Sequence, residues 1–309
     1  MRLLQTRALT DLGHAFNRPN SQVVAVAASV VLLVAGFAMW AAWLTRDVDE
    51  PRLTVTFLQT SYGESIFIRT PNDNRLLIDG GGDENEVAHS LGSLLGPWDR
   101  NIDIVMLTHP DTDHVGGLTA VLGDFHVDTV IHSGIQASSD VFDKWSTAIE
   151  DHNDVVVVRP GMTLGLDHDV FLDVISGGCL EASVVCANAN DASIVARLRH
   201  GEISFLLTGD IERAAELRLA NSIANLRSTV FKAPHHGSAT SSTSSFIEVV
   251  DPAAVVVAVG TQNRYRHPDE DVMARLKRAV GADRVFRTDL LGAVVFETNG
   301  KRLWTVYQN

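Results

Sequence analysis

The chain has 309 residues, of which 45% are hydrophobic and 20% charged, and its formal net charge at pH 7 is −13. This composition excludes a low-complexity or disordered chain and predicts a folded protein with at least one large core. The acidic balance argues against a broadly basic nucleic-acid-binding surface, but not against phosphodiester chemistry, because bound divalent cations would reverse the local charge.

The first predicted element is an apolar helix near the N-terminus. Residues 23–44 contain no charged side chain, a length that suits a helix of about 20 residues spanning a bilayer. We therefore expect a cytoplasmic segment over residues 1–21, a membrane helix over 22–45 and a hydrolase domain over 52–309. A cleaved secretory signal is the alternative, although the apolar run exceeds the ~7–15 residues of a signal-peptide core.

Charged residues on either side of this helix predict its orientation. Arg2, Arg7 and Arg18 precede it, whereas residues 46–50 are net acidic. Positive residues favour the cytoplasmic side of a membrane. The sequence thus predicts a single-pass protein of the cell membrane whose soluble domain faces outside the cytoplasm.

From residue 52 onward, the pattern predicts two successive sets of strands and helices. Short β-rich runs bounded by Gly, Pro or Asn indicate strands. In the first half they cover 53–58, 65–69, 75–78, 103–107, 129–132 and 155–158; in the second half they cover 170–175, 193–198, 203–207, 230–232, 254–258 and 293–296. Apolar spacing predicts helices over 84–95, 118–122, 212–220, 244–250 and 270–279. Two packed sheets with helices outside give a four-layer αββα sandwich of the α/β class.

The segment 178–191 is the longest one without clear periodicity, and we expect it to be a rim or lid loop. It contains Cys179 and Cys186. These residues either form a local disulfide, as suits an oxidising compartment, or remain two thiols.

Candidate metal ligands follow three of the predicted strands. Residues 109–114 read His-Pro-Asp-Thr-Asp-His directly after an apolar run. Asp210 follows the strand predicted at 203–207, and His235 and His236 follow the one at 230–232. His and Asp side chains that converge from three strand ends on one pocket can hold two metal ions.

These motifs resemble those of the metallo-β-lactamase superfamily, and specifically the hydrolase domain of ComEC-type competence proteins. The resemblance covers nearly all of residues 53–307. Its motifs are LLIDGGG at 76–82, LTHPDTDHVGG at 107–117, NDASIV at 190–195, LLTGDIE at 206–212, KAPHHGS at 232–238 and HPDEDV at 267–272. ComEC-type proteins also carry a multi-span channel region, whereas a single span is predicted here. The resemblance therefore implies a standalone, single-span hydrolase rather than a DNA channel.

The resemblance implies two divalent metal ions and a ligand set for them. His109 and Asp111 would serve one ion, Asp113 and His114 would serve the other, and Asp210 would bridge both. A carboxylate at position 111 replaces the second histidine of the general superfamily pattern. Because it enriches the site in oxygen ligands, both Zn²⁺ and Mn²⁺ are candidates.

Further residues are expected to complete or support the ligand set. Either His235 or His236 would finish one metal's shell, a choice that the sequence leaves open. Asp79 is expected to orient a ligating histidine, or else to form a turn before three glycines. Asn190 and Ser193 stand in a segment where many superfamily members have another histidine, and we expect them beside the ligands.

Other residues are candidates for catalysis and substrate binding. Asp113 and Asp210 would hold and orient the attacking water. His267 would donate a proton to the leaving group or hold a substrate phosphate, or else it only precedes Pro268 at a helix entry. Three basic residues are either phosphate contacts or solvated charges: Lys232, Arg264 and Arg266.

The sequence thus predicts a membrane-anchored, dinuclear metal-dependent hydrolase that cleaves phosphodiesters, DNA included, outside the cytoplasm, with a link to DNA uptake. Hydrolysis of a small ester, lactone or phosphocholine-like substrate is an alternative, because the same nucleophile attacks those bonds. A non-catalytic tethered partner of an envelope or DNA-uptake complex is another, although the intact ligand set argues against it. Asp111 disfavours β-lactam hydrolysis.

Overall fold

The computed structural model describes residues 21–44, 51–150, 152, 154–178 and 188–307. The chain divides into two compact units, one up to residue 50 and one from residue 51 onward. Cys179 and Cys186 lie outside the described residues, as do residues 1–20 of the predicted cytoplasmic segment. The predictions that depend on them stay predictions.

The first unit contains one helix, α1, over Ser21–Leu44. Its described apolar side chains are exposed, with exposed fractions of 73% for both Leu32 and Leu33. None of the helices among the described residues combines the length and the hydropathy that a membrane span requires. The predicted membrane helix therefore stays a prediction.

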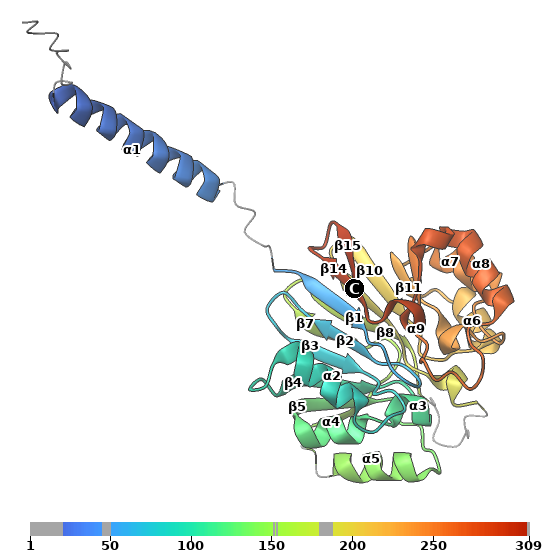
Figure 1. Ribbon diagram of the computed structural model, residues 1–309. Helices are drawn as coiled ribbons and strands as arrows, with labels where there is room; N and C mark the ends of the chain where they lie inside the picture. The colour runs from blue at the N-terminus through green and yellow to red at the C-terminus, as the bar shows by residue number, and fades with distance from the viewer. Residues whose placement is uncertain (1–20, 45–50, 151, 153, 179–187, 308–309) are drawn as a thin grey trace, which may run out of the picture. The chain divides into compact units, whose positions relative to one another are not determined.

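The second unit is built on two β-sheets (Figure 1). The eight-stranded sheet has the order β15 (Leu303–Tyr307), β14 (Val294–Thr298), β1 (Leu53–Phe57), β2 (Ile66–Arg69), β3 (Arg75–Ile78), β4 (Asn101–Leu107), β5 (His126–His132) and β6 (Val155–Val157). The seven-stranded sheet has the order β13 (Val285–Arg287), β12 (Ala254–Val257), β11 (Val230–Lys232), β10 (Ile203–Leu207), β9 (Val195–His200), β8 (Val170–Ser176) and β7 (Thr163–Asp167).

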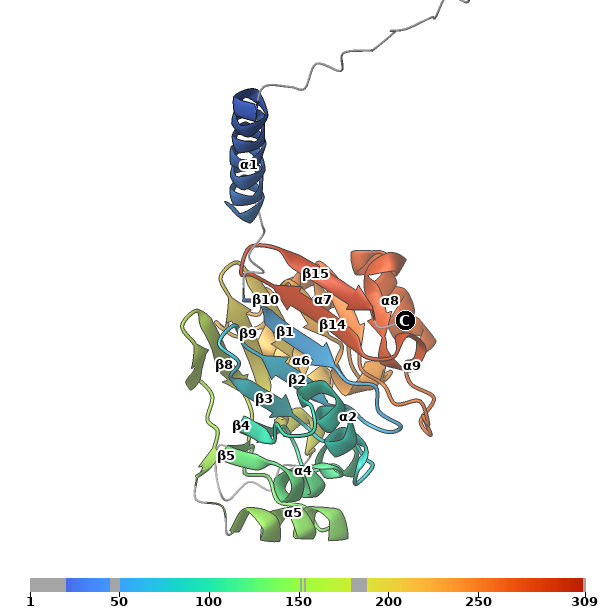
Figure 2. The same ribbon diagram turned by 60° about the vertical axis from the view of Figure 1, so that its left-hand side comes forward.

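Helices cover the outer face of each sheet (Figures 1 and 2). The eight-stranded sheet packs against α2 (Glu86–Leu95), α4 (Leu118–Asp124) and α5 (Asp140–Glu150). The seven-stranded sheet packs against α6 (Arg213–Ala220), α7 (Ser244–Val250) and α8 (Glu270–Val280). Two short helices, α3 (Thr112–Val115) and α9 (Thr288–Leu291), lie in connections. The predicted α/β fold of two packed sheets is confirmed.

The largest apolar cluster fills the space between the two sheets. At its centre the ring of Phe296 meets three other aromatic rings nearly edge-on, with centroid distances of 6.2 Å to Phe57, 5.9 Å to Phe205 and 5.5 Å to Phe286. Edge-to-face packing is favourable for aromatic pairs. Since two of these rings come from the seven-stranded sheet and two from the other, the cluster fixes how the sheets pack.

The last two strands differ from the prediction. The pattern assigned residues 293–296 to the second set of strands, but β14 pairs antiparallel with β1, with Phe296 opposite Val55. Strand β15 then pairs with β14 at the edge of the same sheet. The prediction was wrong because alternation of apolar residues identifies a strand and its buried face, not its partner. The pattern also missed α5, β7, β13 and β15.

Parallel strands in both sheets place their carboxyl ends together. Strands β3, β4 and β5 run parallel in one sheet, and β10, β11 and β12 run parallel in the other. In sheets of this kind, ligands bind in the crevice outside the carboxyl ends of the strands. The residues after β3, β4, β10 and β11 are therefore where a site is expected.

The aromatic cluster predicts a large effect of truncating Phe205, whose exposed fraction is 1%. Phe205→Ala should lower the free energy of unfolding by about 3–5 kcal/mol, because it removes buried apolar surface and leaves a cavity. Urea unfolding followed by circular dichroism measures this. Leu290→Ala, at a side chain that is 69% exposed, is the control and should change the free energy by less than about 0.5 kcal/mol. Equal effects of the two substitutions would contradict the packing described.

Candidate metal centre

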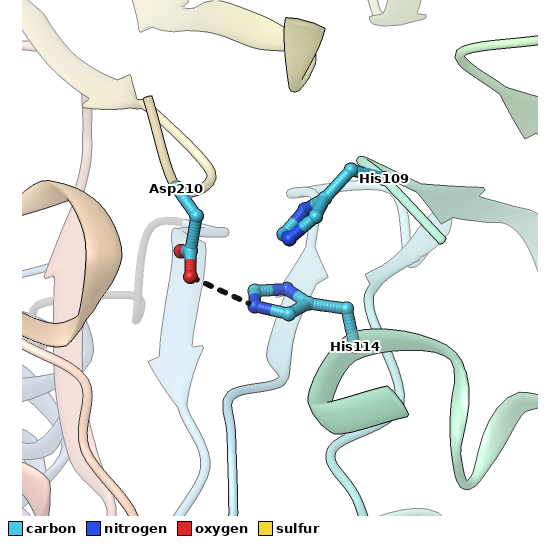
Figure 3. Close-up of side chains that lie close together, drawn as sticks. All are labelled: His109, His114 and Asp210. Carbon is cyan, nitrogen blue, oxygen red and sulfur yellow. Dashed lines mark ion pairs between the residues drawn. The ribbon is translucent and has the colours of Figure 1, made fainter. Parts of the chain in front are cut away.

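A cluster of His and Asp side chains lies at the carboxyl ends of the parallel strands. Its members are Asp79 after β3, His109 after β4, Asp113 and His114 in α3, Asp210 after β10 and His236 after β11. One potential ligand atom from each of His109, His114 and Asp210 lies within 4.8 Å of the other two, and Figure 3 shows these side chains directed toward a common point. The cluster thus joins the ends of both sheets.

Asp210 lies close to the ring nitrogens of two histidines. Its Oδ2 lies 3.3 Å from Nε2 of His114 (Figure 3) and 3.2 Å from Nε2 of His236. The same His236 nitrogen lies 3.3 Å from Oδ2 of Asp113. Asp113, His114 and His236 therefore form a second group of three potential ligands, with their ligand atoms within 4.8 Å of one another.

The other ring nitrogen of each histidine is already engaged. Nδ1 of His114 lies 2.8 Å from the carboxylate of Asp79, and Nδ1 of His236 lies 2.8 Å from the carbonyl oxygen of Ala258. Nδ1 of His109 lies 3.1 Å from the neighbouring Thr108 hydroxyl. These contacts fix the rings so that the Nε2 atoms face the site, as is usual for histidines that bind metals.

The three inward-facing Nε2 atoms are buried and make no hydrogen bond among the described residues. Buried polar atoms normally have a partner. The two groups together hold three imidazole nitrogens and two carboxylates, and ligands of these kinds suit divalent cations such as Zn²⁺ or Mn²⁺. The residues therefore fit a metal site.

Proton binding is favoured at His114 and His236 but disfavoured at His109. Burial lowers the pKa of His109 well below its usual value, and the neighbouring His114 lowers it further. Burial also acts to lower the pKa of His114, but the Asp210 carboxylate and its partners outweigh it and raise this pKa well above its usual value. In His236 the carboxylates of Asp210 and Asp113 outweigh burial and raise the pKa to about 10.

The two carboxylates show the opposite balance. Burial acts to raise the pKa of Asp113, but the contact with the His236 ring and the charge of His114 hold it well below its usual range. The pKa of Asp210 is likewise held low, since His236, His114 and Lys232 outweigh its burial. The environment of the cluster thus favours ionised carboxylates and a bound positive charge. A metal ion would supply that charge and would displace protons from the histidines.

Asp79 supports the cluster from beneath. It is fully buried with a positive φ of 59°. Its Oδ1 accepts a hydrogen bond from the backbone N–H of Thr108 at 2.8 Å, and its Oδ2 accepts one from the Thr108 hydroxyl at 2.7 Å, besides contacting His114. One carboxylate therefore fixes both the end of β4 and the orientation of a histidine.

Two glycine positions let the surrounding loops approach closely. A Cβ atom at Gly63, where φ is +75°, would lie 1.8 Å from the carbonyl oxygen of Asp113. A Cβ atom at Gly116 would lie 2.7 Å from the carbonyl oxygens of both Gly81 and Gly82. The glycines after β3 thus pass directly against the α3 segment.

A buried ion pair, which the sequence did not predict, adjoins the cluster. Nζ of Lys232 lies 2.5 Å from Oε2 of Glu64 and 3.3 Å from Oδ1 of Asp210. Lys232 was predicted either to contact a substrate phosphate or to be a solvated charge, but it is fully buried and its ammonium is bound by protein oxygens. Burial acts to lower the pKa of Lys232, but the carboxylates of Glu64 and Asp210 outweigh it and raise that pKa. The prediction for Lys232 was wrong because a charged side chain was assumed to be exposed.

Two further predicted ligands lie at the edge of the cluster. The Asp111 side chain is 48% exposed, and its Oδ2 lies 3.8 Å from Nε2 of His109. His235 points elsewhere, since its Nδ1 lies 3.3 Å from the carboxylate of Glu212 and 3.3 Å from the Thr240 hydroxyl. Of the two adjacent histidines, the structure thus places His236 in the cluster and His235 outside it.

The cluster forms the floor of a cavity of about 300 Å³. Its lining includes Asp113, Asp210 and His236 from the cluster and the more exposed side chains of Tyr62, Asp111, Ser138, Ser139, His235, Tyr265 and His267. The ring of His267 stacks on Tyr265 with a centroid distance of 5.9 Å and lies 5.5 Å from the ring of His235. Burial lowers the pKa of His267. Burial and the charge of Asp113 raise the pKa of Tyr62, which shares a hydrogen bond with Tyr265.

The remaining predicted residues lie around the site. Ser193 is buried, and its hydroxyl accepts a hydrogen bond from the backbone N–H of Asp210 at 3.1 Å. Asn190 begins a short 3-10 turn whose backbone is bound by Asn188, and it is in none of the ligand groups found among the described residues. Arg264 and Arg266 are exposed and are not among the residues that line the cavity.

Comparison with protein families gives one family match, to the metallo-beta-lactamase superfamily over residues 60–260. Among curated proteins, the chain is 31% identical over 276 residues to competence protein ComA of Neisseria gonorrhoeae, covering 86% of this chain and 35% of that protein. It is 29% identical over 259 residues to ComE operon protein 3 of Bacillus subtilis, covering 78% and 32%. The chain thus spans about a third of the length of these relatives. The predicted resemblance to competence proteins is confirmed.

Solved structures share the fold at low sequence identity. The metallo-beta-lactamase fold protein YhfI from Bacillus subtilis matches with a TM-score of 0.53 and 12% identity, covering 80% of this chain and 100% of that one. A metallo hydrolase from the archaeon Ignicoccus hospitalis matches with a TM-score of 0.51 and 12% identity over the same shares. At this identity the likeness concerns the fold alone.

The contacts of Asp79 predict that it controls metal affinity without being a ligand. Asp79→Ala should weaken the binding of Zn²⁺ or Mn²⁺ by about 10–100-fold, because His114 loses the acceptor that fixes its ring. Titration calorimetry of the purified protein measures this. Asp124→Ala, at an exposed carboxylate, should leave the affinity unchanged, and an Asp79→Ala variant with unchanged affinity would refute the supporting role.

Proposed function

Because this chain belongs to the metallo-beta-lactamase superfamily, we propose that it is a metal-dependent hydrolase with two divalent ions, and that it cleaves phosphodiester bonds. The observation that carries the proposal is the buried cluster in which three unpartnered histidine Nε2 atoms face two ionised carboxylates. Burying charged and unpaired polar groups is costly, and bound cations would offset that cost.

The ligand groups suggest how the two ions would be held. Asp113, His114 and His236 would hold one ion, and His109 and Asp111 would hold the other. Asp210 lies between the two groups and would be shared. The first group is buried more deeply than Asp111, which is half exposed. Ligands from both carboxylates and imidazoles accommodate either Zn²⁺ or Mn²⁺.

When bound, the ions supply a water of lowered pKa and polarise a substrate oxygen. The carboxylates of Asp113 and Asp210 would accept hydrogen bonds from the attacking water and direct its lone pair toward the substrate. His267 stands on the cavity wall, where one N–H of its ring would hold a phosphate oxygen. Because its pKa is lowered, we favour this holding role over proton donation to the leaving group.

The names of the relatives motivate the proposed link to DNA uptake. Two of them are named as a competence protein and a ComE operon protein. A link of this chain to DNA uptake, with DNA as a substrate, is part of the proposal. The main alternative is a small ester, lactone or phosphocholine-like substrate, which is favoured by one observation: among the described residues that line the cavity, none is Lys or Arg. Arg264 and Arg266 would reach only a substrate that extends beyond the cavity.

We further propose that α1 anchors the protein in the cell membrane by a single pass, with the hydrolase domain outside the cytoplasm. The uncharged residues 23–44 and the basic residues before them support this. The alternative, a non-catalytic tethered partner in an envelope complex, requires the same anchor but not the intact cluster.

Activity assays test the catalytic proposal. The protein loaded with Mn²⁺ or with Zn²⁺ should hydrolyse bis-p-nitrophenyl phosphate and degrade single-stranded DNA, and Asp113→Ala and Asp210→Ala should each reduce turnover by more than about 100-fold. Asp283→Ala, at an exposed carboxylate, is the matched control with unchanged turnover. Two bound ions per chain without turnover on either substrate would overturn the phosphodiesterase proposal and direct the search to esters and lactones.

Cell fractionation tests the anchor. The full chain should sediment with membranes, and Leu32→Lys/Leu33→Lys should shift it to the soluble fraction, since each central Lys disfavours insertion by about 2.5–3.5 kcal/mol. Leu290→Lys, at an exposed position of the hydrolase domain, should leave the distribution unchanged. Cleavage of the hydrolase domain by protease added to spheroplasts tests the orientation, and protection of that domain would place it in the cytoplasm instead.

A further inference from the structure

The buried ammonium of Lys232 has three acceptors and no exposure. Its Nζ donates to the carbonyl oxygen of Gly209 at 2.6 Å and lies 2.5 Å from Oε2 of Glu64 and 3.3 Å from Oδ1 of Asp210. The ammonium thus donates two hydrogen bonds, to Gly209 and Asp210, and forms an ion pair with Glu64. Lys232 is thus committed to this one arrangement.

The carboxylate of Asp210 has a different partner on each oxygen. Oδ1 accepts from Lys232, whereas Oδ2 faces Nε2 of His114 and of His236. Its backbone is also fixed, because the N–H of Asp210 donates to the hydroxyl of Ser193. The carboxylate therefore has one oxygen turned to the fold and one turned to the metal ligands.

Glu64 completes the arrangement from the opposite sheet. It follows β1 in the eight-stranded sheet, whereas Lys232 is the last residue of β11 in the seven-stranded sheet. Its Oε2 also lies 3.5 Å from Nδ1 of His236. Glu64 lies close enough to His236 and Asp210 to form a ligand group. Its Oε2 accepts no hydrogen bond among the described residues, but it forms the 2.5 Å ion pair with the Lys232 ammonium. Glu64 therefore acts on Lys232 rather than on a metal.

We propose that Lys232 and Glu64 are positioning residues that reserve Oδ1 of Asp210, so that Asp210 offers only Oδ2 to the metal ions. This inference rests on the proposed metal-dependent function and deepens it. A carboxylate that is already held in one rotamer does not have to rearrange when the ions bind. Supporting contacts around metal ligands generally act in this way, because they fix the orientation of the ligand. The alternative hypothesis is that the Lys232–Glu64 ion pair stabilises the fold and has no effect on metal binding.

Single and double substitutions distinguish the two hypotheses, because they predict different changes in metal affinity. Lys232→Met removes a positive charge beside the site, so electrostatics alone would strengthen cation binding, whereas lost positioning would weaken it. This variant leaves Glu64 buried and unpaired, which threatens folding. The double variant Glu64→Met/Lys232→Met avoids that difficulty, since it removes both charges and leaves the net charge unchanged.

The experiment is a calorimetric titration of Mn²⁺ and of Zn²⁺ into the full chain and the double variant, with melting temperatures measured in chelator. The matched control is Asp173→Met/Arg199→Met, which removes a partly exposed ion pair of 2.7 Å between β8 and β9. We expect the double variant to melt as a folded protein and to bind metal at least about tenfold more weakly than wild type. The control should bind as wild type does.

The outcomes distinguish the inference from the proposed function. The positioning role would be overturned if the double variant bound metal as tightly as wild type or more tightly. The proposed metal centre itself would be unaffected by that result. Weaker metal binding by the double variant would support that role even if the wild type hydrolysed no phosphodiester. Wild-type protein that binds no metal would overturn the proposed function and this inference together.

Discussion

The buried carboxylate of Asp210 is the interaction on which the rest of the site depends. Removing a carboxylate from water costs several kcal/mol unless opposite charges and hydrogen-bond donors replace the water. Here the replacement comes from both sheets: His114 follows β4 of one sheet, and His236 and Lys232 belong to the β11 segment of the other. The sheets therefore cannot shift relative to each other without exposing that charge to an uncompensated interior. The site is therefore complete only where the two sheets are packed as described.

The parts that hold metal ligands and the parts that face substrate have different structural character. The ligands stand at the ends of buried parallel strands, and their outer contacts, such as Asp79 with His114, are fully buried. The cavity wall is formed by more exposed side chains such as Tyr265, which is 65% exposed. A rigid floor with an exposed wall fixes the hydrolytic chemistry and leaves substrate choice to a few surface residues, as is usual where function is carried on loops of a fixed scaffold.

The sequence predicted what is local and missed what is not. The fold class and the cluster at residues 109–114 and Asp210 were predictable, because ligand-type residues directly after apolar runs leave a short-range pattern. Glu64 was missed because a single Glu after Tyr-Gly has no spacing that marks it, and its importance comes only from Lys232 on another sheet. Lys232 was misassigned for the same reason, since burial of a charge depends on a distant partner. The position of β14 beside β1 is also a pairing between chain ends, which alternation does not encode.

The charge distribution bears on how such a site would bind an anionic substrate. The chain is acidic, with a net charge of −13, and the described residues that line the cavity include neither Lys nor Arg. Lys232, which lies beside the cluster, forms ion pairs with Glu64 and Asp210 and does not line the cavity. Attraction for a phosphate would therefore come almost entirely from the divalent ions, whose charge dominates the local field. Substrate affinity and catalysis would then depend on the same two ions. A protein of this kind would have little affinity for nucleic acid away from its metal centre.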